Sequence, residues 1–179
     1  MASAKISALT NQATILGADE FAINSAGVSK RVSWNTIRAD APGKELDYVQ
    51  ITATVNIVST TEATGTTIIT SSAVTFDGAA VIFEFFSPSV TSESVAADQT
   101  VISLFEGATQ IGRLATIRTA AAGVTREPCD GKLRFTPTAG VHTYTVTAFS
   151  TATTGTPAVG AGLSGTGNLV PAYSRIVKV

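Results

Sequence analysis

"YVQITATVNIV", residues 48–58, alternates apolar and polar side chains without a break. A strict period of two places the two kinds of side chain on opposite faces of an extended chain, which predicts a β-strand buried on one side. "HTYTVTAF", residues 142–149, repeats this alternation. Both stretches indicate a sheet with one face on a core and one face in water. The apolar positions of the first stretch are Val49, Ile51, Ala53, Val55 and Ile57.

Further segments rich in threonine, valine, isoleucine and phenylalanine predict more strands. Short turns with Gly separate several of them, and no amphipathic helix lies between them. Parallel strands need crossover helices, so the pattern predicts an all-β fold, an antiparallel β-sandwich or jelly roll, over residues 48–179. The segments are residues 66–70, 73–76, 80–87, 100–107, 110–118, 131–138 and 168–179, and the turns are Asp77-Gly78, Glu106-Gly107, Asp130-Gly131 and Ala139-Gly140.

Residues 1–47 form a small mixed N-terminal segment with a different composition. They hold five of the twelve Lys and Arg residues but three threonines, and Pro42-Gly43 marks a break near their end. Residues 20–34 predict two short strands around a turn at Gly27, and Ser33 is suited to cap a helical turn after them. Because this segment is too small to bury a core of its own, we expect it to pack on a partner surface.

Composition excludes several classes of function. The chain has 179 residues, of which 44% are hydrophobic, so it can build a folded core. Charged residues make up 14% and the net charge is -1, which gives no electrostatic basis for binding nucleic acid. The N-terminus lacks the apolar run of a signal peptide, and no stretch approaches the roughly 18 apolar residues that span a bilayer. We therefore expect synthesis in the cytoplasm and no membrane insertion.

Motifs of catalysis and cofactor binding are weak in this sequence. "GAGLSG", residues 160–165, matches the dinucleotide-binding pattern by letter, but Pro171 and β-branched residues follow where a helix is required. Cys129 and His142 are single, which excludes an intrachain disulfide and a cysteine-based zinc site. We interpret Cys129 as an incidental thiol in a loop and His142 as a surface residue at a strand end. We expect no cofactor and no catalytic residue.

Carboxylates offer two further possibilities. Glu93, Asp98, Glu127 and Asp130 fall in predicted loops, yet they lack the dense Asp series of a calcium loop, so we expect solvated charges and no metal. Glu84 and Glu106 are the acidic residues inside predicted strands. A polysaccharide-degrading enzyme would need such a pair at a defined separation, and this is the least favoured function.

"AVIFEFF", residues 80–86, is apolar on both of its faces. Val81, Phe83 and Phe85 share one face, while Ile82 and Phe86 flank Glu84 on the other. A sandwich strand normally has one wet face, so this pattern predicts a second buried surface. Two interpretations stay open, namely a strand covered by a loop of its own chain and a strand in a subunit interface.

The leader "KISALTNQATILGADEFAINSAGVSKRVSWNTI", residues 5–37, resembles the leaders of bacteriophage tail-fibre and related virion proteins. Thr10 stands where such leaders usually carry proline. Residues 51–179 resemble the C-terminal head domain of phage fibre and minor structural proteins. The similar positions are Lys5–Leu9, Asp19, Phe21–Ile23, Gly27, Lys30–Val32 and Trp34–Ile37 in the leader, and residues 73–90, 100–117, 134–150 and 165–179 in the remainder.

This resemblance implies a jelly roll of the tumour-necrosis-factor type, assembled as a homotrimer on a virion. Residues 1–47 would attach the chain to other virion proteins, and residues 48–179 would form a trimeric knob without enzymatic activity. The residues expected in virion attachment are Ile6, Leu9, Phe21, Ile23, Val32, Trp34 and Ile37. Those expected in the trimer interface are Val81, Phe83, Phe85, Tyr173, Ile176 and Val177.

Four predicted loops of the knob are candidate contact surfaces: residues 59–66, 87–99, 119–131 and 150–165. Their Ser, Thr and Gly content suits hydrogen bonding to a host cell-surface glycan or protein, and it suits solvated loops equally well. The knob would then be a fibre or spike head that binds a host receptor. The alternative is a capsid decoration or head-fibre protein without host recognition, and the sequence does not discriminate between the two.

Overall fold

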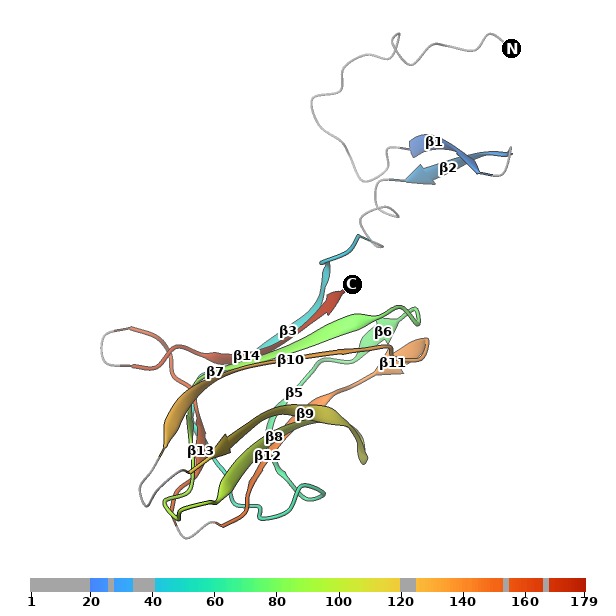
Figure 1. The fold of residues 1–179 in the computed structure, drawn as a ribbon. Coiled ribbons are helices and arrows are strands. Elements are labelled where there is room, and N and C mark those ends of the chain that lie inside the picture. Colours follow the sequence, from blue (N-terminus) through green and yellow to red (C-terminus); the bar gives the residue numbers. More distant parts are fainter. Residues whose placement is uncertain (1–19, 26–27, 34–40, 120–124, 153–154, 166–167) are drawn as a thin grey trace. The chain divides into compact units, whose positions relative to one another are not determined.

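The computed structural model describes residues 20–25, 28–33, 41–119, 125–152, 155–165 and 168–179. The chain divides into two compact units, residues 1–44 and residues 45–179. All regular elements in the described ranges are β-strands (Figure 1). No helix in these ranges is long and apolar enough to cross a membrane.

The first unit contains one β-hairpin. Strands β1 (Glu20–Ser25) and β2 (Val28–Ser33) pair antiparallel, with Glu20 opposite Ser33 and Ser25 opposite Val28. The two short strands predicted for this region are therefore confirmed. The helical turn predicted after Ser33 lies outside the described residues.

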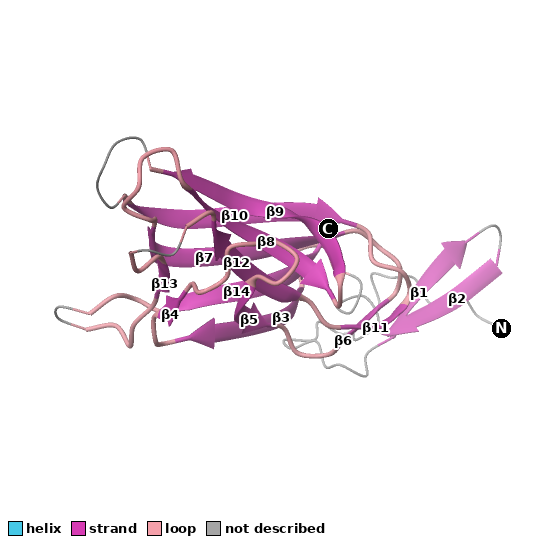
Figure 2. Cartoon of the chain, turned by 90° about the horizontal axis from the view of Figure 1, so that it is seen from below, coloured by secondary structure: helices cyan, strands magenta, loops and turns pink. Residues whose placement is uncertain are grey.

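The second unit is a sandwich of two sheets (Figure 2). In one sheet the order is β5-β12-β8-β9; in the other it is β3-β14-β7, with β10 on the free side of β7 and the short strands β13 and β4 continuing beyond the end of β14. A small pair, β6 and β11, lies at the opposite end. The bounds are β3 (Glu45–Ile51), β4 (Val55–Asn56), β5 (Thr66–Thr70), β6 (Val74–Phe76), β7 (Val81–Thr91), β8 (Gln99–Glu106), β9 (Thr109–Arg118), β10 (Arg126–Phe135), β11 (Gly140–His142), β12 (Thr145–Ser150), β13 (Ala158–Gly160) and β14 (Ala172–Lys178).

The pairing of the eight long strands is nested. The first long strand pairs with the last (β3 with β14), the second with the second last (β5 with β12), the third with the third last (β7 with β10), and the middle two with each other (β8 with β9). All these pairs are antiparallel. Such nesting wraps a hairpin-like chain around a core and defines a jelly roll, which confirms the predicted fold class.

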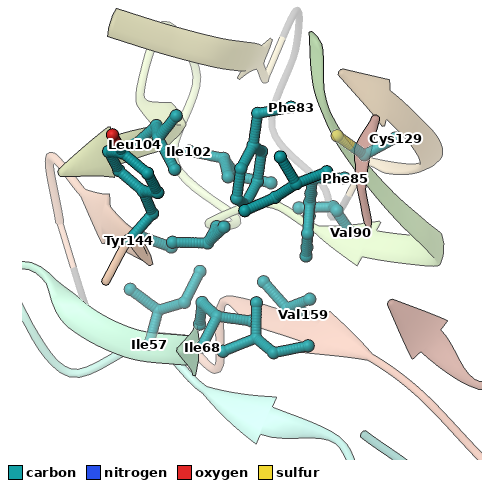
Figure 3. Packing of buried hydrophobic residues seen from close by; sticks show 14 of the residues in the cluster. Ile57, Ile68, Phe83, Phe85, Val90, Ile102, Leu104, Cys129, Tyr144 and Val159 are labelled. Atoms are coloured by element: carbon teal, nitrogen blue, oxygen red, sulfur yellow. The ribbon is translucent and has the colours of Figure 1, made fainter. Parts of the chain in front are cut away.

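The core fills the space between the two sheets (Figure 3). Tyr144 is fully buried, and its ring meets the rings of Phe76, Phe83 and Phe135 edge to face, with centroids 5.8, 6.5 and 5.1 Å away. Edge-to-face packing adds to the stabilisation from buried apolar area. Burial also raises the pKa of Tyr144 to about 12, so its phenol stays neutral. Phe83 and Phe85 lie beside it, completely buried.

Residues 48–58 form two strands rather than one. β3 starts at Glu45 and ends at Ile51, and β4 covers Val55–Asn56. The cause is a change of partner, because β3 pairs with β14 whereas β4 pairs with β13. Alternation predicted the faces of the chain but carried no information on which neighbour each half would meet.

The turn predicted at Asp130-Gly131 is wrong, since both residues lie inside β10. A Cβ atom on Gly131 would come within 2.8 Å of the Cβ and carbonyl oxygen of Leu114 in β9. Gly131 therefore permits close approach of two strands instead of making a turn. Cys129 also lies in β10 rather than in a loop; its burial raises the pKa of the thiol to about 11, which keeps it protonated and unreactive.

Candidate functional site

The residues predicted for virion attachment are partly described. Phe21 and Ile23 lie in β1, and Val32 lies in β2, where it is half-buried. Ile6, Leu9, Trp34 and Ile37 lie outside the described residues. The attachment role of this segment stays a prediction.

Most residues predicted for the trimer interface lie elsewhere. Val81, Phe83, Phe85 and Ile176 are at most 1% exposed and belong to the core of a single chain. They point between the sheets, so they have no surface to offer a partner, and this part of the hypothesis is corrected. Tyr173 and Val177 are half-buried and alternate with the core positions of β14, so they point outward. The face available to a partner is thus the outer side of β7 and β14.

Stacked aromatic rings cross this outer side. Tyr173 of β14 lies between Phe86 of β7 and Tyr48 of β3, with both ring centroids 5.4 Å from its own. Phe86 is the register partner of Tyr173 and points the same way. Tyr48 keeps 46% of its surface exposed. Stacking buries part of the apolar area of each ring within the chain. The part that stays exposed is available to a partner.

A row of charges runs beside the rings across three strands. Arg175 of β14 donates from Nε and Nη2 to Oε2 of Glu84 in β7, at 2.9 and 2.5 Å, and Lys132 of β10 lies 3.6 Å from Oε1. The bond to Glu84 raises the pKa of Arg175 further. We name the surface of Tyr48, Ile82, Glu84, Phe86, Tyr173, Arg175 and Val177 the outer face.

A second feature, a polar trough of about 400 Å³, lies at the end of the molecule where β4 and β13 meet β7 and β10. Three of the four predicted contact loops converge here, although parts of them are strands. Residues 87–99 supply Ser89 and Thr91, residues 119–131 supply Arg126, and residues 150–165 supply Ala158 and Gly160. The lining residues are Thr54, Asn56, Ser89, Thr91, Arg126, Thr156, Ala158, Gly160 and Leu169.

Register explains the shape of the trough. Asn56, Ala158, Thr91 and Arg126 are consecutive partners across β4, β13, β7 and β10, so they form one row over four strands. Gly160 stands opposite Ser89 in the next row. The middle strand carries small side chains while both neighbours carry hydroxyl or amide groups. A strip of small residues between larger ones leaves a hollow on a sheet surface.

The fourth predicted contact loop, residues 59–66, is fastened to the other sheet by Glu62. Its Oε1 accepts hydrogen bonds from Ser103 Oγ and Gln110 Nε2, each at 2.6 Å, and Arg113 reaches both carboxylate oxygens at 2.9 and 2.7 Å. The bonds from Arg113 lower the pKa of Glu62 to about 2. A depression of about 320 Å³ lies beside this loop, lined by threonine, glycine and Phe105.

Glu62→Gln should lower the free energy of unfolding by about 1 kcal/mol at pH 7. The value is modest because the Arg113 side chain is 54% exposed and water screens the pair. Since the folded-state pKa of Glu62 is depressed, its stabilisation is present above pH 4.5 and is lost as the pH falls toward 2. Urea unfolding of both proteins at pH 7, 4.5 and 2.5 measures this. Equal differences at all three pH values would contradict the assignment.

The structure also places the histidine and the carboxylate pair that the sequence singled out. His142, predicted at the surface, is mostly buried; its Nδ1 is bonded to Glu106, and its ring stacks on Tyr144. Glu84 and Glu106, the candidate carboxylate pair, lie on strands of different sheets, each with a basic partner.

The four acidic residues predicted in loops are also placed. Glu127 and Asp130 lie in β10, which corrects the prediction of loops there. Glu93 is fully buried and accepts from the backbone N–H groups of Ser94 and Gly155, whereas Asp98 accepts from Thr151 Oγ1. No three His, Cys, Asp or Glu side chains in the described ranges gather closely enough to hold a metal ion.

Two solved structures from infectious bursal disease virus are similar to this chain. The crystal structure of the VP2 subviral particle matches with a TM-score of 0.40 and 9% identity, and the structure of the Gx strain with 0.32 and 14%. Each match covers 86% of this chain and 40% of the other, so the chain spans less than half the length of these neighbours. No protein-family model and no curated protein sequence matches the chain.

Proposed function

We propose that this chain is a non-enzymatic structural protein of a virion, a trimeric fibre or spike knob on an N-terminal attachment segment. The resemblance of residues 5–37 and 51–179 to phage fibre leaders and heads supports the virion role, and viral capsid domains are among the users of the jelly roll. The link to capsid domains is an analogy of fold alone. The observation that carries the assembly is the outer face, with its row of stacked rings.

The outer face has the properties of an interface between copies. Of the eight large apolar side chains that the described residues leave exposed, Tyr48 lies in the outer face on β3, and Val170 and Val179 flank β14. Closed cyclic symmetry brings one region of every chain to a common axis, so a single apolar strip can serve all copies. Arg175 and Glu84 neutralise each other within the chain, which removes like-charge repulsion between copies.

The test of this assembly is the solution mass of the full chain by light scattering behind size exclusion. We expect three times the 18.3 kDa chain mass at micromolar concentration. A chain that stays monomeric up to 100 μM would overturn the trimeric knob. The attachment role is tested by removing residues 1–44 and assaying purified particles for the protein by mass spectrometry. Loss from particles is expected, and normal incorporation would assign attachment to the sandwich.

A capsid decoration protein without host recognition is the alternative. The polar trough favours host recognition, because three of the four predicted contact loops supply residues to one concave surface. Binding of the purified, fluorescently labelled chain to host cells is the expected result. A decoration protein would leave those cells unlabelled.

A further inference from the structure

We infer that the polar trough at β4, β13, β7 and β10 binds a saccharide that carries a carboxylate group. The inference rests on the proposed function, in which the knob meets a host surface, and it names the chemistry of the ligand. It is carried by three observations: the volume of the trough, the groups along its walls, and one arginine, Arg126, that forms no ion pair with another residue described by the structure.

The volume of the trough admits a ring-sized ligand. Ala158 and Gly160 form the floor, and they lie on β13, between the taller walls from β4 and β7. Ser89 and Leu169 of the same chain approach Gly160 closely, because a Cβ atom there would lie 2.7 Å from the Ser89 carbonyl oxygen and 3.0 Å from Leu169 Cδ1. The volume of about 400 Å³ lies within the range of small-molecule sites.

The walls suit a ligand rich in hydroxyl groups. Three wall side chains can both donate and accept hydrogen bonds, namely Asn56, Thr91 and Thr156. A sugar hydroxyl can also do both, so hydrogen bonds between the wall and the sugar can form with either group as the donor. Thr54 already shares its hydroxyl with Ala161 and is a poorer candidate. Leu169, 41% exposed at the rim, offers an apolar contact for the C–H face of a sugar ring.

The charge selects an acidic sugar over a neutral one. Arg126 ends the row of side chains, is exposed, and forms no ion pair with any described residue. Guanidinium matches a carboxylate with two parallel hydrogen bonds. Glu127 follows directly but pairs with Val90 in the next register position and does not line the trough. The ligand carboxylate therefore meets Arg126 without a competing protein carboxylate in the lining.

The experiment is a titration of the isotope-labelled full chain, followed by amide chemical shifts, with four probes: D-glucuronic acid, N-acetylneuraminic acid, D-glucose and inorganic phosphate. We expect millimolar dissociation constants for at least one of the two acids, shifts at Thr91, Ala158 and Gly160, and at least tenfold weaker binding of glucose. Arg126→Gln should weaken binding of the acid about tenfold. Arg118→Gln, an exposed arginine outside the trough, is the matched control and should change nothing.

Thr91→Val tests the wall without changing its size and should weaken binding of the acid about threefold. The inference would be overturned if neither acid bound, or if glucose bound as tightly as the acid. It would also be overturned if phosphate bound in a way that depends on Arg126, or if the Arg126→Gln protein bound the acid normally. The solution mass of the same sample separates this failure from that of the proposed function. A trimer that binds none of the four probes would support the proposed knob and contradict the proposed ligand.

Discussion

Phe83→Ala should lower the free energy of unfolding by about 4 kcal/mol, a large fraction of the stability of a domain this size. The side chain is completely buried in the core and its ring meets Tyr144 at 6.5 Å. Truncation removes the transfer free energy of the ring and leaves a cavity that two paired sheets cannot close by collapse. The measurement is urea unfolding followed by tyrosine fluorescence at a fixed chain concentration.

Phe83→Asp should prevent folding altogether, since it buries a carboxylate without a partner. This outcome separates a core position from an interface position. If Phe83→Asp gave a folded monomer with native circular dichroism, Phe83 would belong to an interface, as the sequence alone suggests. Val141→Ala, at a position that is 66% exposed, is the control and should shift the unfolding free energy by less than 0.5 kcal/mol.

The two faces of "AVIFEFF" show how far sequence reasoning reaches. Alternation correctly separates Phe83 from Phe86, because side chains in a strand point to opposite sides by geometry. It does not say which side is the core, since both sides are apolar. The answer depends on the partner layer, where Leu104 of β8 and Tyr144, between β11 and β12, share the core with Phe83 and not with Phe86 (Figure 3). Residue pattern predicted the sandwich, and only the pairing of strands assigns its inside.

The polar trough was predictable in its parts and not as a site. The Ser- and Thr-rich stretches that contain Thr91, Arg126 and Ala158 stood out as contact candidates. Their meeting in one row depends on the registers of β7, β10 and β13, which local sequence does not encode. β13 itself has three residues, and its brevity hides the period of two. Gly160 falls in the predicted loop of residues 150–165, but in the structure it is buried in β13.

Phe86→Asp should dissociate the proposed trimer while the chain stays folded. Phe86 is three residues from Phe83 on the same strand, but it is half-buried on the outer face and stacks on Tyr173. In the proposed trimer, a charge at this position would bring like charges from three chains close to the common axis and would remove an aromatic contact from each interface. Truncating an interface anchor typically costs about 2 kcal/mol per contact, roughly a 30-fold rise in the dissociation constant.

Light scattering on Phe86→Asp and Val141→Asp, at equal concentrations, compares this effect with a charge placed elsewhere. Val141 lies in β11, away from the outer face, so its variant should keep the mass of the parent protein. Circular dichroism should show native sheet content for both variants. A Phe86→Asp trimer that withstands dilution to 1 μM would remove the outer face as the interface. The exposed apolar side chains around β14 would then require another partner, such as a neighbouring virion protein.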